Sequence, residues 1–193
     1  EGFRRLSECP ALLGEIMDVL YYNYDRIDFV DAPVDLGFEC PLDLHCTYSR
    51  DQILAALDFM KPGTVREGTK YLPDKKTDVH FVTLNKAEKD YSPTTMYEDY
   101  SINEVLFHWQ SQSTTSQSST TGQRYMNHRS MGVRELLFVR EFKSGKLGAA
   151  PYTFLGLADF LSVTGSKTMN ITWRLHEPIP AKYLRKTNKL VVG

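Results

Sequence analysis

The sequence predicts an α+β protein in which a small N-terminal helical unit packs on a curved, mostly antiparallel β-barrel. Apolar residues recur at helical spacing after Pro10, whereas after Met60 they come in short runs separated by turns that contain Gly and Pro. The charge changes at the same place. Residues 1–60 hold twelve Asp and Glu against four Arg and Lys, and residues 61–193 hold twelve against nineteen. We therefore expect two domains, an acidic helical segment over 1–60 and a basic β-rich domain over 61–193.

Two helices are expected in the acidic segment. The first begins at Pro10, a residue favoured in the first turn of a helix, and carries an apolar stripe that includes Leu13 and Leu20. The second follows Ser49 and Gln52, which have the spacing of a capping box. Two helices bury too little apolar surface to fold alone, so we expect them to pack on the barrel or on a domain that precedes them.

Five strands are expected in the basic domain, where β-branched and aromatic residues alternate or cluster. They cover residues 69–72, 79–84, 135–142, 152–160 and 169–175. Ser101 and Glu104 have the spacing of a further capping box, which predicts a short helix from Ile102 to Trp109. Residues 111–123 are almost entirely Ser, Thr and Gln and cannot bury apolar surface. We expect them to form a mobile loop or a segment that orders on a ligand.

The composition narrows the class of protein. Hydrophobic residues make up 41% and charged residues 24%, as in ordinary globular proteins, and no apolar run approaches the roughly 20 residues of a membrane span. The N-terminus lacks the pattern of a signal peptide, so we expect a cytoplasmic protein, and its start at Glu1 fits a fragment of a longer polypeptide. Cys9, Cys40 and Cys46 lack CxxC spacing, so we expect reduced cysteines, no metal and no cofactor.

Residues 78–113 are the candidate ligand-binding stretch. They combine aromatic rings with a carboxylate and side-chain amides, the groups that hold a flat polar ring and bond to its edge. Trp173 is the competing aromatic residue, but it lies in the apolar run ITWRL and is expected in the core. We expect a base to stack on Trp109, with Asp99 accepting from its amino group. The candidate base-pocket residues are Tyr91, Tyr97, Asp99, Tyr100, Trp109, Gln110 and Ser111.

Basic residues on both sides of this stretch are candidates for contacts to the DNA backbone. Phosphate contacts of this kind position a protein on DNA without reading its sequence. The net charge of +7 over residues 61–193 predicts binding that weakens as salt rises. The candidate backbone contacts are Lys86, Lys89, Arg124, His128, Arg129, Lys182, Arg185, Lys186 and Lys189.

Three strings carry a resemblance to a known family. They are DKKTDVHFVTLNKAEKDYSPTTMYEDYSINEVLFHWQSQS, APYTFLGLADF and MNITWRLHEPIPAKYLRKTNKL. They resemble the C-terminal domain of unknown function found on bacterial superfamily 2 helicases, and the resemblance covers essentially the whole chain. In those proteins the domain often follows a phospholipase D-like nuclease and a helicase core, an architecture associated with ATP-dependent, modification-dependent (type IV) restriction.

The resemblance implies a DNA-binding domain of a restriction system that recognises 5-methyl- or 5-hydroxymethylcytosine by base flipping. The order of the elements is also similar to PUA-like folds such as the SRA and EVE domains, which implies a base-reading barrel by analogy. The implied partners are DNA with methylated or hydroxymethylated cytosine and the helicase and nuclease domains of the same polypeptide, with no membrane.

We do not expect this chain to be an enzyme by itself. It contains no GxxxxGK[ST] string, no DExx-box helicase motif and no HxK nuclease motif, so ATP hydrolysis and strand cleavage do not carry over to it. Two other hypotheses stay open. One is an enzyme that uses a histidine such as His80 with a carboxylate such as Asp78. The other is a protein-interaction or regulatory domain that docks on the helicase–nuclease core through the acidic helices.

Overall fold

The chain forms two compact units, residues 1–31 and 32–193, in a computed structural model that describes residues 6–24, 32–65, 68–85, 99–145, 148–181 and 183–184. The boundary between these units lies at residue 31, because Leu36, Leu42 and helix α3 (Arg50–Ala56) pack on the sheet. The division into domains at 1–60 and 61–193 stays a prediction about folding units. No helix among the described residues is long and apolar enough to cross a membrane.

Helix α2 (Pro10–Tyr24) is the main element of the first unit, and it begins at the expected proline. Leu13 is half-buried, whereas Leu20 is 55% exposed and Tyr21 is 60% exposed. The apolar stripe that the spacing predicts is therefore present on this helix, and much of it is open to solvent.

The second unit is built on an eight-stranded mixed sheet in the order β2-β3-β6-β9-β10-β5-β4, with β1 paired to β9. Strands β3 and β6 run parallel, and the other pairs are antiparallel. Strands β2 and β4 end this order, and no pairing among the described residues joins them. The α+β class is confirmed, and the described sheet is open. The strands are β1 (Thr47–Tyr48), β2 (Thr69–Leu72), β3 (Thr77–Asn85), β4 (Tyr100–Ser101), β5 (Leu106–Gln110), β6 (Arg134–Phe142), β9 (Tyr152–Thr164) and β10 (Asn170–Leu175).

The five expected strands are present as β2, β3, β6, β9 and β10, and the capping box at Ser49 and Gln52 begins α3 as predicted.

The remaining elements are short. The other elements are the 3₁₀ turns η1 (Pro62–Thr64) and η2 (Pro73–Lys75), the helices α4 (Thr120–Met126) and α5 (His128–Met131), and a ribbon of β7 (Ser144–Gly145) with β8 (Gly148–Ala149).

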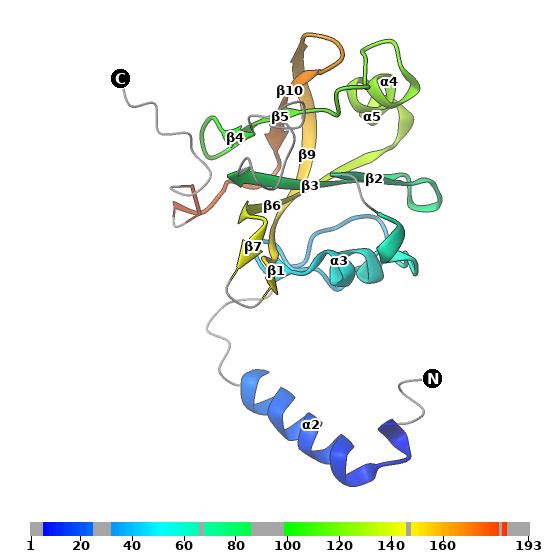
Figure 1. Ribbon diagram of the computed structural model, residues 1–193, viewed down its shortest axis with the longest axis vertical. Helices are drawn as coiled ribbons and strands as arrows, with labels where there is room; N and C mark the ends of the chain where they lie inside the picture. Colours follow the sequence, from blue (N-terminus) through cyan, green and yellow to red (C-terminus); the bar gives the residue numbers. More distant parts are fainter. Residues whose placement is uncertain are drawn as a thin grey trace. The chain divides into compact units, whose positions relative to one another are not determined.

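Apolar layers cover both faces of the sheet, because successive side chains of a strand point to opposite faces. In β6, Leu136 and Phe138 join the layer beneath α3, while Leu137 and Val139 join the layer beneath α4. We call these the α3 layer and the α4 layer. Figure 1 shows α3 on one side of the sheet and α4 with α5 on the other. Trp173 is fully buried in the α4 layer, which confirms its expected place in the core.

The expected helix from Ile102 to Trp109 is wrong. The chain forms a tight hairpin there, in which β4 pairs with β5 and the Asn103 side chain accepts hydrogen bonds from the backbone N–H groups of Val105 and Leu106. Phe107 and Trp109 alternate with half-buried neighbours and point into the α4 layer. Burial of alternate aromatic residues on a sheet therefore outweighed the capping signal at the start of the segment.

The run of Ser, Thr and Gln at 111–123 forms turns and then the first residues of α4. Ser119 caps α4 by accepting from the Gly122 N–H, and Gln117 donates to the Gly165 carbonyl, which lies far along the chain. Short polar side chains that bond to nearby backbone groups favour turns and helix N-termini. The run thus leads into α4, a helix that the apolar pattern did not predict.

We predict that Gly122→Ala destabilises the protein by roughly 1–3 kcal/mol, although alanine normally favours a helix. A Cβ atom at position 122 would lie 2.0 Å from the Ser116 carbonyl oxygen and 3.0 Å from the Met169 sulfur. Urea unfolding measures the change in the free energy of unfolding. Gly63→Ala is the matched control, since nothing lies within 4 Å of its added Cβ. A Gly122→Ala protein as stable as the parent would contradict the close packing of α4 on this segment.

Candidate functional site

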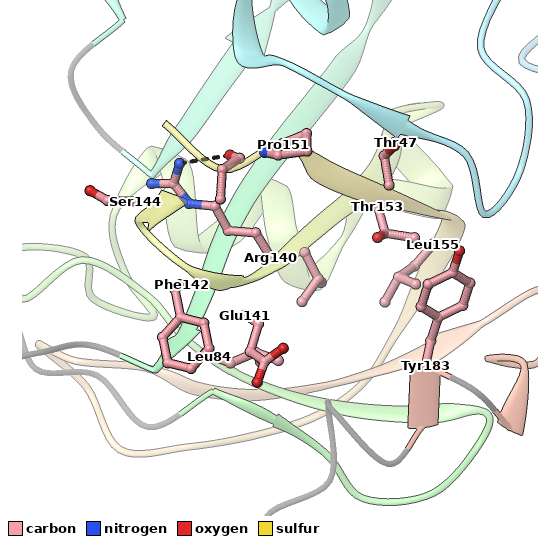
Figure 2. Close-up of a pocket in the computed structure, with 12 residues that line it drawn as sticks. Thr47, Leu84, Arg140, Glu141, Phe142, Ser144, Pro151, Thr153, Leu155 and Tyr183 are labelled. Carbon is pink, nitrogen blue, oxygen red and sulfur yellow. Dashed lines mark hydrogen bonds between the residues drawn. The ribbon is translucent and has the colours of Figure 1, made fainter. Parts of the chain in front are cut away.

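A hollow of about 290 Å³ opens where β6 ends and β9 begins, which is close to the size of the smallest pockets that hold small molecules. Figure 2 shows the side chains around it, which come from strands β1, β3, β6, β7 and β9, from the segment just before β9, and from Tyr183. The lining residues are Thr47, Leu84, Val139, Arg140, Glu141, Phe142, Ser144, Ala150, Pro151, Thr153, Leu155 and Tyr183.

The floor of the hollow is apolar and its sides are aromatic. Val139 and Leu155 are 3% and 1% exposed and belong to the α4 layer. Phe142 is 52% exposed and Tyr183 is half-buried, and Figure 2 shows their rings on opposite sides of the opening with the Glu141 carboxylate between them. Two ring faces, an apolar floor and one carboxylate are suited to a planar ligand with a polar edge.

The guanidinium of Arg140, another lining residue, is bonded to its neighbours. Its Nε donates to the Thr83 hydroxyl at 2.9 Å, and its Nη1 donates to the Ala150 carbonyl at 3.2 Å. Its guanidinium carbon lies 4.4 Å from the centre of the Tyr152 ring, a residue of the α3 layer. Among the described lining residues, Glu141 is the acidic side chain at the opening (Figure 2).

A second group of polar side chains is buried in the α4 layer, beneath α4. Asp78 of β3 is completely buried and accepts two hydrogen bonds from Arg124 of α4, at 2.5 and 3.0 Å. The Arg124 guanidinium also lies 4.0 Å from the centre of the Tyr71 ring. This bidentate ion pair between Arg124 and Asp78 holds α4 on the sheet. Removing either partner would leave the other charged group in the core without a counter-charge.

His80 and Glu135 lie beside this ion pair, and both are completely buried. The His80 Nε2 and the Glu135 Oε2 are 2.6 Å apart. The His80 ring contacts three aromatic rings, with centroids 4.7 Å from Trp109, 5.4 Å from Tyr125 and 5.5 Å from Trp173. The other His80 nitrogen, the other Glu135 oxygen and the Trp173 Nε1 have no hydrogen-bond partner in the described part of the chain.

Burial keeps this pair uncharged. It lowers the pKa of His80 to about 3 and raises the pKa of Glu135 well above its usual value. The carboxyl group of Glu135 therefore carries the proton and donates it to Nε2 of His80. In the folded protein the two side chains share one titratable proton, which Glu135 holds. In an unfolded chain each of them titrates near its ordinary pKa. A buried neutral pair closed off by aromatic rings is a structural element in this conformation and lacks access for a substrate.

The expected base-pocket residues that the structure describes make contacts within the sheet. Trp109 is 5% exposed, with its ring against His80, Tyr125 and Trp173. Asp99 accepts from the Gln110 backbone N–H at 2.8 Å, so it stabilises the β4–β5 edge.

The neighbouring candidates are also engaged within the sheet. The Gln110 side chain donates to Asn170 at 2.7 Å, and the Ser111 hydroxyl accepts from the Met169 N–H at 2.9 Å. The Tyr100 ring lies 4.9 Å from that of His108. Their role as a pocket stays a prediction, as do those of Tyr91 and Tyr97, which lie outside the described residues.

Of the candidate backbone contacts, Arg124 is bound to Asp78 as described above. His128 is 3% exposed, and its Nδ1–H donates to the Val133 carbonyl while its Nε2 accepts from the Phe160 N–H. Arg129 is 66% exposed at its side chain and pairs with Asp159 at 2.6 Å, so it can also reach a phosphate. The side chains of the other candidates lie outside the described residues: Lys86, Lys89, Lys182, Arg185, Lys186 and Lys189.

Sequence reasoning missed the hollow. Its signal was the change of character in the strand ELLFVREF, where a charged and aromatic end, Arg140 to Phe142, follows four apolar residues. Such an end can mark a strand that leaves the core at the rim of a site. The opposite wall comes from β1, β9 and Tyr183, which the strand pattern alone does not bring to the same place.

Residues 42–186 match the family described as "Domain of unknown function (DUF3427)". The match covers most of the chain, and the chain belongs to this family. It includes every lining residue of the hollow and the whole buried group around His80. A comparison with curated proteins finds no match.

We predict that the His80–Glu135 pair makes stability depend on pH on both sides of an optimum at about pH 4.5–6.5. The folded pKa of His80 lies below its ordinary value of 6.5, so its contribution is lost as the pH falls below 6.5. The folded pKa of Glu135 lies above its ordinary value of 4.5, so its contribution is lost as the pH rises. Above pH 6.5 only the second effect acts, with a limiting slope of about 1.4 kcal/mol per pH unit.

Glu135→Gln tests this, because the amide imitates the protonated carboxyl group and cannot ionise. Urea unfolding between pH 5.5 and 8.5 should show a flatter profile for Glu135→Gln than for the parent protein. Glu177→Gln, a change at an exposed carboxylate, should keep the parent profile. Parallel profiles for the parent and Glu135→Gln would show that Glu135 is ionised in the folded protein.

Proposed function

We propose that this domain binds DNA and takes a single modified cytosine, 5-methyl or 5-hydroxymethyl, out of the duplex and into the hollow. The observation that supports the proposal is the combination of two aromatic rings, Phe142 and Tyr183, with a carboxylate and an apolar floor in one opening. A flipped base needs aromatic faces to replace its lost stacking and polar groups that bond to its edge.

The energies are compatible with this assignment. Removing a base from a duplex costs a few kcal/mol, and each aromatic ring that stacks on it returns about 1–3 kcal/mol. Stacking on one of the two rings therefore offsets much of the cost of flipping. The side chains of Val139 and Leu155 offer an apolar surface to a methyl group at position 5 of the base.

We place the base in the hollow and not against Trp109, because the ring of Trp109 packs against the rings of His80, Tyr125 and Trp173. Tyr91 and Tyr97 stay candidates, since they follow Leu84, a lining residue, closely in the sequence. The resemblance to helicase-associated domains supports the wider context: a reader domain of PUA or SRA type that serves helicase and nuclease domains of the same polypeptide in the cytoplasm, without being an enzyme itself.

A second candidate function is docking on the helicase–nuclease core. The observation in its favour is helix α2, on which Val19, Leu20 and Tyr22 are 55–60% exposed. A helix that exposes this much apolar surface is typical of an interaction site. Docking through α2 and base reading through the hollow use different residues, so one protein can do both.

We predict that Phe142→Ala lowers the affinity for DNA with a flipped modified cytosine about ten- to a hundredfold, and with it the preference over unmodified DNA, because one stacking face for the base is lost. Fluorescence anisotropy with oligonucleotides that differ only in the modification measures this preference. Leu161→Ala is the matched control, since Leu161 is an exposed apolar residue outside the hollow. A Phe142→Ala protein that folds normally and still discriminates as well as the parent would contradict the proposed pocket.

We also predict that Arg129→Ala weakens binding to modified and unmodified DNA alike. Loss of one phosphate contact lowers the slope of log affinity against log salt by about 0.9. Titrations at four salt concentrations measure this slope. An unchanged slope would exclude Arg129 from the DNA-binding surface, and a parent affinity that does not vary with salt would exclude electrostatic docking altogether.

A further inference from the structure

We infer that the hollow selects a planar ring that carries an exocyclic amino group, and that Glu141 determines this specificity by accepting a hydrogen bond from the amino group. The inference rests on the proposed function, since it concerns a base held in the same hollow. It assigns to one residue the discrimination between a 4-amino and a 4-oxo pyrimidine.

The two charged side chains of the hollow are used differently. Arg140 and Glu141 are neighbours in β6, and Figure 2 shows their side chains pointing apart. The Nε and Nη1 of Arg140 donate to the Thr83 hydroxyl and the Ala150 carbonyl, and its guanidinium lies over the Tyr152 ring. The Glu141 carboxylate is therefore the acidic group that the described lining presents to a ligand.

The carboxylate of Glu141 has an aromatic neighbour at the rim of the hollow. Glu141 lies two residues after Val139 near the end of β6, and both residues line the hollow. Figure 2 shows the Glu141 carboxylate beside the Phe142 ring, with Tyr183 across the opening. A planar ring stacked on Phe142 would thus place one edge near the carboxylate.

The polar groups of the hollow differ in the hydrogen bonds that they can make. The hydroxyl groups of Thr47 and Thr153 can donate or accept, so they fit an amino or a carbonyl group equally well. An ionised carboxylate can only accept. The Glu141 carboxylate therefore favours an amino group and opposes a carbonyl oxygen, which would bring two acceptors together. A site that loses a hydrogen bond and gains such a repulsion rejects the wrong ligand strongly.

The sharpest test compares 5-methylcytosine with thymine, because these bases differ only in the amino or oxo group at position 4 and its effect on N3. Each base is placed opposite an abasic site in the same duplex, so that the cost of extrusion is similar. The chain of residues 1–193 should bind the 5-methylcytosine duplex about ten- to a hundredfold more tightly than the thymine duplex. Glu141→Gln should reduce this ratio to about threefold or less, since its amide can donate to a carbonyl or accept from an amino group.

Glu177→Gln, which removes the same charge from an exposed position, should keep the ratio of the parent protein. A Glu141→Gln protein that keeps the full preference would overturn the inference. If Phe142→Ala still lowers the affinity for both bases in that case, the proposed pocket stands and only the role of Glu141 is wrong. If neither Phe142→Ala nor Glu141→Gln changes the binding of either duplex, the base does not enter the hollow, and the proposed function and this inference both fail.

Discussion

The parallel pairing of β3 and β6 is the constraint on which most of the structure depends. Parallel strands cannot be joined by a tight turn, so the chain between Asn85 and Arg134 has to cross the sheet before it returns. That connection includes β4, β5, α4 and α5, and α4 covers the face to which Asp78 and His80 point. The crossover thus places Arg124 opposite Asp78, and the buried ion pair follows from the topology.

The α4 layer connects this buried group to the hollow. Its central part contains the neutral His80–Glu135 pair surrounded by Trp109 and Trp173, and its margin contains Val139 and Leu155, which form the floor of the hollow. The Asp78–Arg124 ion pair and the close aromatic contacts hold α4 and the strands of this layer together. Tyr183 packs on the margin of the layer, and Phe142 is half-exposed at the rim of the hollow.

The sequence predicted the elements that local pattern decides. The five strands and the capping box at Ser49 needed only periodicity and turn residues. The helix predicted from Ile102 to Trp109 was wrong because burial of alternate aromatic residues on the sheet, an effect of tertiary packing, outweighed the capping signal. The hollow was missed for a related reason: Glu141 and Tyr183 are far apart in the chain, and the folded structure is needed to show that both line one hollow.

The central claim, that a modified base enters the hollow, is tested most directly by NMR spectroscopy of the complex. A duplex with a ¹³C-labelled methyl group on one 5-methylcytosine is bound to protein with labelled methyl groups. The account predicts nuclear Overhauser effects between the base methyl group and the methyl groups of Val139 and Leu155, which form the floor of the hollow. Contacts from the base methyl group to the Trp109 ring instead, or none to the protein in a saturated complex, would contradict it.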